Sequence, residues 1–327
     1  MLVNYSDCYI QIYTKIEKMI LDLAEYAGLP GDNLNKYYVP LMQWKKAGCP
    51  SKVSSKSELL IKSEELSEEK ILEQFARSLQ NSGQMRNSIK FDDEQRYDKL
   101  WGMIADWYKG FNPDSENSGE SIGYLYSIIW DLFNGNNWLK DQNGSKKEKD
   151  PRKSKKNLCK YVVGLYEAAR YLKEKQNSSQ TGYQLINEAI GKSFLTDFDA
   201  AQVILEKLNI TKIRGLGPAL SIDFLKESGC LYLPKPDTHL VNVVIGLQES
   251  SINSKKEKSA FKIMIEFAQA LNKKGIVCTS YKLDKMIWLL CTGNFYLETA
   301  NEQEGLREIR GFRDILIRSL ANLNSVF

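Results

Sequence analysis

Apolar residues recur at helical spacing along most of the chain, and this pattern restricts its fold more than any other feature. The first segment illustrates it, with apolar side chains three or four positions apart at Ile10, Tyr13, Ile16, Ile20 and Leu23. Such spacing places them on one face of an α-helix. Alternating runs of β-branched residues, which are typical of strands, are nearly absent. The sequence therefore predicts an all-α fold.

The same spacing predicts further helices, separated by connectors rich in glycine, proline and serine. One long helix or two abutting ones are expected over about 59–79, before a break at Asn81-Ser82-Gly83. The others are expected over about 97–107, 122–133, 158–175, 183–191, 198–208, 218–228, 238–248, 257–273, 281–297 and 304–325.

The composition is that of an ordinary globular protein, with 43% hydrophobic and 26% charged residues among 327. This length suffices for one large domain or two of ordinary size. No apolar run approaches the roughly 18–20 residues that span a bilayer, so no membrane partner is expected. The first residues lack the basic and then apolar layout of a secretion signal, so a cytoplasmic protein is expected. We further expect a monomer.

The cysteines and the histidine give no metal-binding pattern. Six cysteines are scattered without a CxxC pair, which argues against a disulfide framework, a zinc ribbon and an iron–sulfur cluster. His239 is the one histidine of the chain, so a histidine-based metal site is not expected either. We therefore expect neither a metal nor a cofactor.

Positive charge is concentrated between Lys140 and Lys160, where nine Lys or Arg residues stand against three Asp or Glu residues. The local net charge is +6, which leaves about −2 for the rest of a chain whose total is +4. The segment is polar and poor in apolar residues, which indicates a mobile loop. Two interpretations stay open: contact with phosphates, or a solvated surface loop.

A glycine-rich stretch over about 211–219 predicts a tight turn that leads into a helix. Gly215 and Gly217 permit positive φ and close backbone approach, and Pro218 suits the first position of a helix. The unpaired N–H groups at such a helix start favour a phosphate. Lys226 is a further candidate for a charged phosphate contact. The predicted DNA-backbone-binding set is Lys212, Arg214, Gly215, Leu216, Gly217 and Ala219.

Asp237 follows this turn at the start of the next predicted helix. One interpretation is an N-cap, a position where aspartate is strongly favoured. The other is a catalytic carboxylate, and the two roles are compatible. His239 lies two residues further on, with a structural role or a proton-shuttle role as alternatives.

The turn and Asp237, separated by a loop rich in glycine and proline, resemble the helix-hairpin-helix superfamily of base-excision DNA glycosylases. The resemblance covers about 45 residues, from roughly 200 to 247. It implies an all-α, two-lobed helical enzyme that clamps double-stranded DNA with the hairpin and flips one nucleotide into a pocket. Asp237 takes the position of the catalytic aspartate. A GxG match alone is weak evidence, and the pair of motifs makes it specific.

The resemblance also implies how the bond is cleaved. Bifunctional members carry a Schiff-base lysine two residues after the second hairpin glycine, and Ala219 occupies that position here. We therefore expect a monofunctional glycosylase that leaves an abasic site. Two alternatives stay open: a non-catalytic DNA-binding protein, or a glycosylase/lyase with Lys235 as a displaced lysine. The excised base is not readable from the sequence, and a hypermodified cytosine in phage DNA, removed as antiviral defence, is one hypothesis.

Base flipping needs a wedge in the duplex and an aromatic surface beside the base. The break in the predicted helix near 81–83 supplies long side chains for a wedge, with an ordinary turn as the alternative. The wedge and base-pocket candidates are Gln80, Asn81, Gln84, Met85 and Trp288. Further aromatic residues, most of them expected in the core, are Trp101, Trp107, Tyr108, Tyr124, Tyr126, Trp130 and Trp138.

The family architecture predicts how the chain is divided. Helices within residues 1–80 are expected to pack with the C-terminal helices of residues 250–327. Residues 81–249 are expected to form the central helical bundle, which carries both the hairpin and Asp237.

Overall fold

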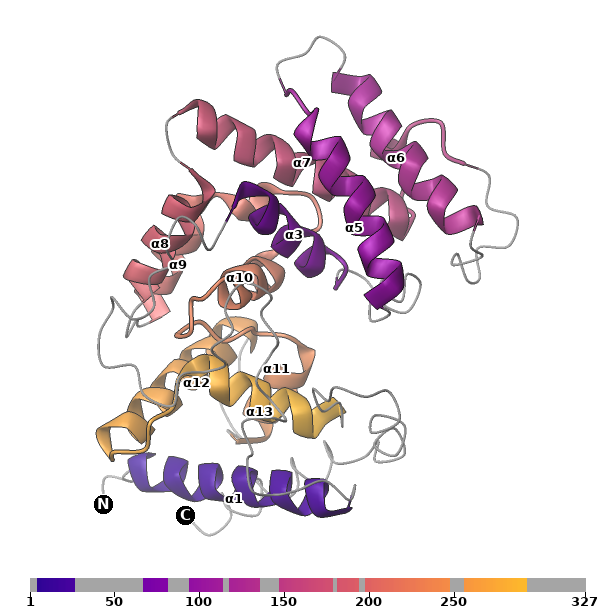
Figure 1. Cartoon of the computed structure of the whole chain (residues 1–327). Helices are drawn as coiled ribbons and strands as arrows, with labels where there is room; N and C mark the ends of the chain where they lie inside the picture. The colour runs from indigo at the N-terminus through magenta and orange to yellow at the C-terminus, as the bar shows by residue number, and fades with distance from the viewer. Residues whose placement is uncertain are drawn as a thin grey trace. The chain divides into compact units, whose positions relative to one another are not determined.

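The computed structural model describes eight parts of the chain, namely residues 5–26, 67–81, 94–113, 118–135, 147–178, 181–193, 198–247 and 256–292. In these parts the regular structure consists of α-helices and two short 3-10 turns, without a strand (Figure 1). The predicted all-α class is confirmed. The helix expected over 304–325 and residues 59–66 of the helix expected over 59–79 lie outside the described residues.

Local sequence signals set several helix ends. Helix α3 (Glu68–Leu79) begins where the Ser67 hydroxyl accepts a 3.3 Å hydrogen bond from the N–H of Lys70. This cap, with Glu68 and Glu69 in the first turn, satisfies N–H groups that the helix itself leaves unpaired. Helix α9 (Phe198–Leu208) has the predicted bounds, and α8 (Gly182–Ser193) is slightly longer than predicted.

The chain divides into two compact units, each assembled from segments far apart in the sequence. Unit 1 comprises residues 1–60, 190–204 and 229–327, and unit 2 comprises residues 61–189 and 205–228. This division differs from the expected one at residues 61–80, 190–204 and 229–249. Asp237 falls in the unit of the N- and C-terminal helices, and α3 falls in the unit that carries the glycine-rich turn.

Unit 1 contains α1 (Tyr5–Tyr26), α11 (Thr238–Leu247), α12 (Lys256–Lys273) and α13 (Ser280–Thr292), together with residues 198–204 of α9. Helix α1 lies beside α12 and α13, which α11 also contacts (Figure 1). The shared core includes Ile16, Ile20 and Phe267, all fully buried. Tyr9 stacks on Phe267 with ring centroids 4.6 Å apart. Helices from the two ends of the described chain therefore share one hydrophobic core.

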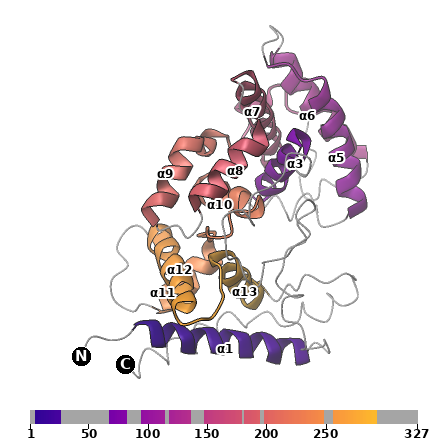
Figure 2. The ribbon, with the colours of Figure 1, turned by 60° about the vertical axis from the view of Figure 1, so that its left-hand side comes forward.

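Unit 2 is built around α7 (Asn157–Asn177), which packs on α3 and on α6 (Ser118–Gly135). Helix α5 (Glu94–Lys109) packs against α6, and α10 (Pro218–Glu227) packs against α3 (Figure 2). Phe75 of α3 and Phe224 of α10 stack with centroids 3.8 Å apart, and both are fully buried. The helix after the glycine-rich turn is thus fixed to α3.

No helix in the described ranges is both long enough and apolar enough to cross a lipid bilayer.

Candidate functional site

The glycine-rich stretch forms a tight turn between α9 and α10. A 3-10 turn, η3 (Ile210–Lys212), is followed by Gly215 at φ 90°, a backbone conformation that favours glycine. The N–H of Leu216 donates to the carbonyl of Ile213 at 3.0 Å, and the Leu216 side chain is fully buried. Pro218 then begins α10, as predicted. Leu216 therefore anchors the turn in the core of unit 2.

The outer side of this turn carries unpaired backbone donors. The N–H groups of Gly215, Gly217, Ala219 and Leu220 make no hydrogen bond to any described residue. Those of Ala219 and Leu220 lie in the first turn of α10, at the positive end of its dipole. Such an arrangement suits an anionic oxygen, which would accept several hydrogen bonds at once.

The turn is docked on α7 through two residues that sequence reasoning missed. The N–H of Arg214 donates to the Glu167 carboxylate at 2.6 Å. At Gly164 a Cβ atom would lie 2.3 Å from the Arg214 carbonyl oxygen and 2.8 Å from Cδ2 of Leu79. A glycine inside an apolar helix is the signal that could have shown this close approach. Gly164 therefore lets the turn reach α7.

The two other cationic candidates near the turn differ in their surroundings. Lys212 is exposed and makes no ion pair within the described residues. Lys226 is 3% exposed, with Nζ 3.7 Å from carboxylate oxygens of both Asp223 and Glu227. The expected phosphate contact of Lys226 is wrong, because its place on α10 directs the side chain into the fold.

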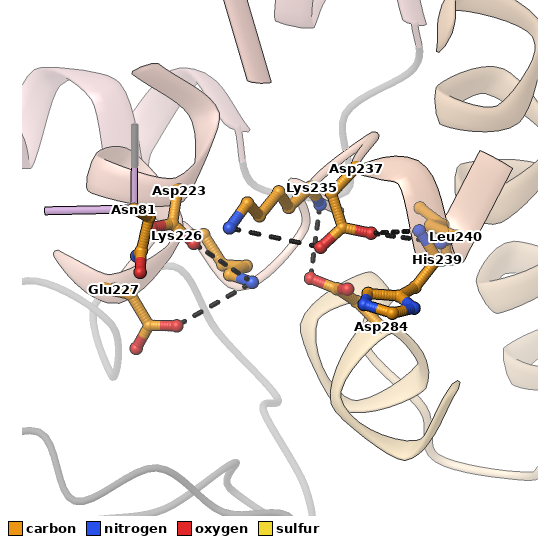
Figure 3. Close-up of polar contacts among 9 residues, drawn as sticks. All are labelled: Asn81, Asp223, Lys226, Glu227, Lys235, Asp237, His239, Leu240 and Asp284. Carbon is orange, nitrogen blue, oxygen red and sulfur yellow. Dashed lines mark hydrogen bonds and ion pairs between the residues drawn. The ribbon is translucent and has the colours of Figure 1, made fainter. Parts of the chain in front are cut away.

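Asp237 caps helix α11 in unit 1 (Figure 3). Its Oδ1 accepts hydrogen bonds from the N–H groups of His239 and Leu240, both at 3.0 Å. Its Oδ2 lies 4.0 Å from Nζ of Lys235, and the carboxylate side chain is 20% exposed. The N-cap interpretation is confirmed. The cap engages one oxygen and leaves Oδ2 outside these two bonds.

The loop before Asp237 is tied to α13 at two points. The N–H of Lys235 donates to Oδ2 of Asp284 at 3.2 Å, and the Asp284 side chain is buried (Figure 3). The N–H of Tyr281 donates to the carbonyl of Leu231 at 3.0 Å. The contact of Asp284 with Lys235 spans 49 positions of the sequence. These bonds hold the segment that carries Lys235 and Asp237.

His239 takes part in this site through its backbone. Its N–H donates to Asp237, while Nδ1 of the imidazole is buried and finds no hydrogen-bond partner among the described residues. The backbone contact fits the structural role, and the proton-shuttle role stays a prediction.

The wedge and pocket candidates are spread over both units. Gln80 caps the end of α3 through its backbone N–H, and the side-chain amide of Asn81 donates to Oδ2 of Asp223 at 3.2 Å. Trp288 lies on α13 and is partly buried. Gln84 and Met85 lie outside the described residues. The use of these side chains in base flipping stays a prediction.

A groove between α5 and α6 in unit 2 collects two of the aromatic residues singled out in the sequence. Its volume is about 440 Å³, and Trp107, Phe111 and Tyr124 contribute to its lining. Tyr124 is 61% exposed, whereas Trp107 and Phe111 are buried in the core beneath it.

Within the described ranges, no three His, Cys, Asp or Glu side chains lie close enough to hold a metal ion. The described residues do offer a fixed carboxylate at Asp237 with the Lys235 ammonium beside it, and unpaired backbone donors at the glycine-rich turn.

No protein-family model, curated protein or solved structure matches the chain.

Proposed function

We propose that this protein is a monofunctional DNA glycosylase of the helix-hairpin-helix type, with Asp237 as its catalytic carboxylate. The observation that carries this proposal is that the two oxygens of the Asp237 carboxylate have different contacts. Oδ1 of Asp237 is held by two backbone N–H groups, and Oδ2 lies outside these bonds on a side chain that retains some exposure. A carboxylate fixed by one oxygen is oriented for chemistry at the other.

The proposed reaction is hydrolysis of an N-glycosidic bond. The bond electrons leave with the base, and positive charge builds up on the sugar in an oxocarbenium-like transition state. The Asp237 carboxylate stabilises that charge and takes a proton from the attacking water, whose oxygen bonds to C1′. The products are a free base and an abasic site, and the DNA strand stays intact.

The glycine-rich turn supplies the proposed DNA contact. Its unpaired N–H groups at Gly215, Gly217 and Ala219 would donate hydrogen bonds to one phosphate, with Lys212 and Arg214 adding positive charge. In this proposal the turn is the hairpin of the motif, α9 and α10 are its two helices, and the two compact units are the two lobes. The partner is double-stranded DNA.

Substitution of Asp237 by asparagine tests the catalytic role. Asparagine caps helices about as well as aspartate, so folding and DNA affinity should be retained. Base release should fall by about 10²–10⁴-fold, the usual range for loss of a general base. The matched control is Asp98→Asn, which removes an exposed carboxylate on α5. Base release is measured by chromatography, and DNA affinity by fluorescence anisotropy.

Unchanged base release in Asp237→Asn would exclude this role for the carboxylate. Binding of DNA without base release by the wild-type protein, on every substrate tried, would favour the non-catalytic DNA-binding alternative.

A glycosylase/lyase is the second candidate, and the position of Lys235 favours it. Its Nζ lies 4.0 Å from Oδ2 of Asp237, and its side chain is 16% exposed. In that reaction a neutral Lys235 amine attacks C1′ and the base leaves with the bond electrons. Asp237 takes a proton from the attacking nitrogen and gives it to O4′ as the C1′–O4′ bond breaks, which leaves C1′ and Nζ joined in a protonated imine. Borohydride reduces an imine to a stable amine, so trapped protein–DNA adduct in the wild type, absent in Lys235→Gln, would establish it. Under the monofunctional proposal no adduct forms.

The proposal also includes the substrate base. We propose that the enzyme excises a modified base from phage DNA, such as a hypermodified cytosine, as antiviral defence. The test is incubation with genomic DNAs that carry different modifications, followed by mass spectrometry of the released bases. Release of alkylated or oxidised bases only would contradict the defence role and support repair.

A further inference from the structure

Residues 147–156, here called the basic strap, run past α6 and the start of α7 to the glycine-rich turn. The strap contains six Lys or Arg residues and two Asp or Glu residues. In the middle lies a 3-10 turn, η2 (Pro151–Lys153), which packs on α7 and α6. All these segments belong to unit 2. The described part of the basic segment is therefore folded against the protein.

The strap is held at four points, and the first is the 3.2 Å ion pair of Lys147 with Asp131 on α6. The N–H of Glu148 donates to the hydroxyl of Tyr126 on α6 at 3.1 Å, and Pro151 is buried. The fourth point is Arg214 of the glycine-rich turn. Its guanidinium donates to the carbonyl of Arg152 at 2.6 Å and to the carbonyl of Ser154 at 3.4 Å. One turn residue therefore joins the strap to the turn.

Arg214 is itself fixed at its backbone. Its N–H is bound by the Glu167 carboxylate, and its carbonyl packs against Gly164 of α7. The strap, the turn and α7 thus meet at Arg214. Because Arg214 binds neutral carbonyls, it brings its own charge next to the cations of the strap.

Three exposed lysines of the strap are Lys149, Lys153 and Lys155, whereas Lys147 and Lys156 form ion pairs with Asp131 and Glu148. Lys149 and Lys155 are exposed and, like Lys212 of the turn, make no ion pair or hydrogen bond within the described part of the chain. Lys153 is 87% exposed at its side chain and lies 3.7 Å from Asp150. Holding like charges side by side costs free energy through mutual repulsion. A solvated loop that is not packed on the protein would reduce this repulsion, because its cations could move apart.

We propose that the basic strap and the glycine-rich turn form one continuous surface for the backbone of duplex DNA. The turn would bind one phosphate through its unpaired N–H groups, and the strap would bind neighbouring phosphates through Lys149, Lys153 and Lys155. A polyanion that spans both sites removes the repulsion and releases its own counterions. This inference rests on the proposed function and extends its DNA contact beyond the hairpin.

The experiment compares how DNA binding depends on salt in two triple variants of the full chain. Lys149, Lys153 and Lys155 are replaced by Gln in the strap variant, and exposed Lys99, Lys109 and Lys262 in the control variant. Both variants lose three positive charges, so a difference between their salt dependences cannot come from net charge alone. The slope of log affinity against log salt concentration is measured with unmodified duplexes of two unrelated sequences.

In the strap variant the slope should become shallower by about three, since each lysine–phosphate contact contributes about one. The loss should be equal for both duplexes, because phosphate contacts carry no sequence information. The control variant should keep a slope close to that of the wild type. Circular dichroism verifies that all variants keep their helix content.

Arg214→Gln tests whether the strap and the turn act together. This variant removes the bonds to both strap carbonyls. A variant that carries both Arg214→Gln and the three strap substitutions should lose less binding free energy than the sum of the two separate losses. The reason is that both changes weaken the same contact with DNA.

Equal slopes in the strap and control variants, or fully additive losses with Arg214→Gln, would overturn the inference and leave the glycosylase proposal standing. Absence of salt-dependent DNA binding in the wild type would overturn both.

Discussion

Asp237 shows, at the scale of one residue, how a helix cap and a reactive group can share a carboxylate. The cap engages Oδ1 with the N–H groups of His239 and Leu240. Capping is satisfied by any short oxygen-bearing side chain, whereas the proposed chemistry needs a negative charge. The two roles therefore respond differently to substitution.

A series at Asp237 separates the two roles. Asp237→Asn and Asp237→Ser should unfold at nearly the wild-type denaturant concentration, because both side chains can cap α11. Asp237→Ala should lose about 1 kcal/mol of unfolding free energy through loss of the cap. All three should lose base release to a similar extent. Base release that follows stability across the series would show that the carboxylate acts through the cap alone.

Glu68 illustrates a buried carboxylate with an effect on stability that depends on pH. Burial raises the pKa of Glu68, although the N–H of Gly182 and the charge of Lys173 lower it. Its Oε1 accepts from the N–H of Gly182, while Oε2 is buried without a partner among the described residues. Ionisation of Glu68 is therefore less favourable in the folded protein than in the unfolded chain.

Glu68→Gln should accordingly stabilise the protein at neutral pH. Below the ordinary pKa of 4.5 both states of the wild type are protonated, so the variant and the wild type should have similar stability. As pH rises above 4.5, the unfolded wild type loses this proton more readily, and the wild type becomes less stable than the variant. Melting temperatures from pH 4 to pH 8 measure the difference. A constant difference across this range would contradict the expectation.

At the scale of elements, the docking of the glycine-rich turn on α7 depends on the absence of a side chain at Gly164. The nearest obstacle to a Cβ atom there is backbone, the Arg214 carbonyl oxygen at 2.3 Å. A backbone neighbour moves only if the whole turn moves. The helix after the turn is also held, since Phe224 stacks on Phe75.

Gly164→Ala should therefore destabilise the protein by about 1–3 kcal/mol, the usual range for an overpacked core. DNA affinity should fall as well, because the turn is displaced. The matched control is Gly102→Ala on α5, where no atom lies within 4 Å of the added Cβ. That control should be neutral or more stable by up to about 1 kcal/mol, because alanine favours helix. Denaturant unfolding of both variants measures the effect, and similar free energies would show that α7 has room at Gly164.

At the scale of the whole molecule, the two units have separate hydrophobic cores. Ile20 belongs to the core shared by α1, α12 and α13, and Leu72 belongs to α3 in unit 2. Both side chains are fully buried. Core truncations at these sites act on different packing interfaces.

Ile20→Ala should increase amide hydrogen exchange in α1, α12 and α13 more than in α3 and α7, and Leu72→Ala should do the reverse. Each change removes buried methyl groups and should cost about 2–5 kcal/mol in its own unit. Exchange resolved by peptide mass spectrometry measures both patterns. The same exchange pattern in both variants would mean that the units unfold as one.

The sequence by itself determined the helical class, most helix positions and the form of the glycine-rich turn. These depend on interactions within a few residues: apolar spacing along a helix, Pro218 at a helix start, positive φ at Gly215, and Asp237 as a cap.

The tertiary structure alone decided which of these elements meet. It buried Lys226, placed Asp237 with the terminal helices, and joined Arg214 to the basic strap. It also fixed the Lys235 loop on α13 through Asp284, across 49 positions. Each of these contacts links residues far apart in the chain or depends on which helix face is covered. The spacing of apolar residues along one helix does not indicate which distant residues it will contact, so these contacts are set only when the helices pack.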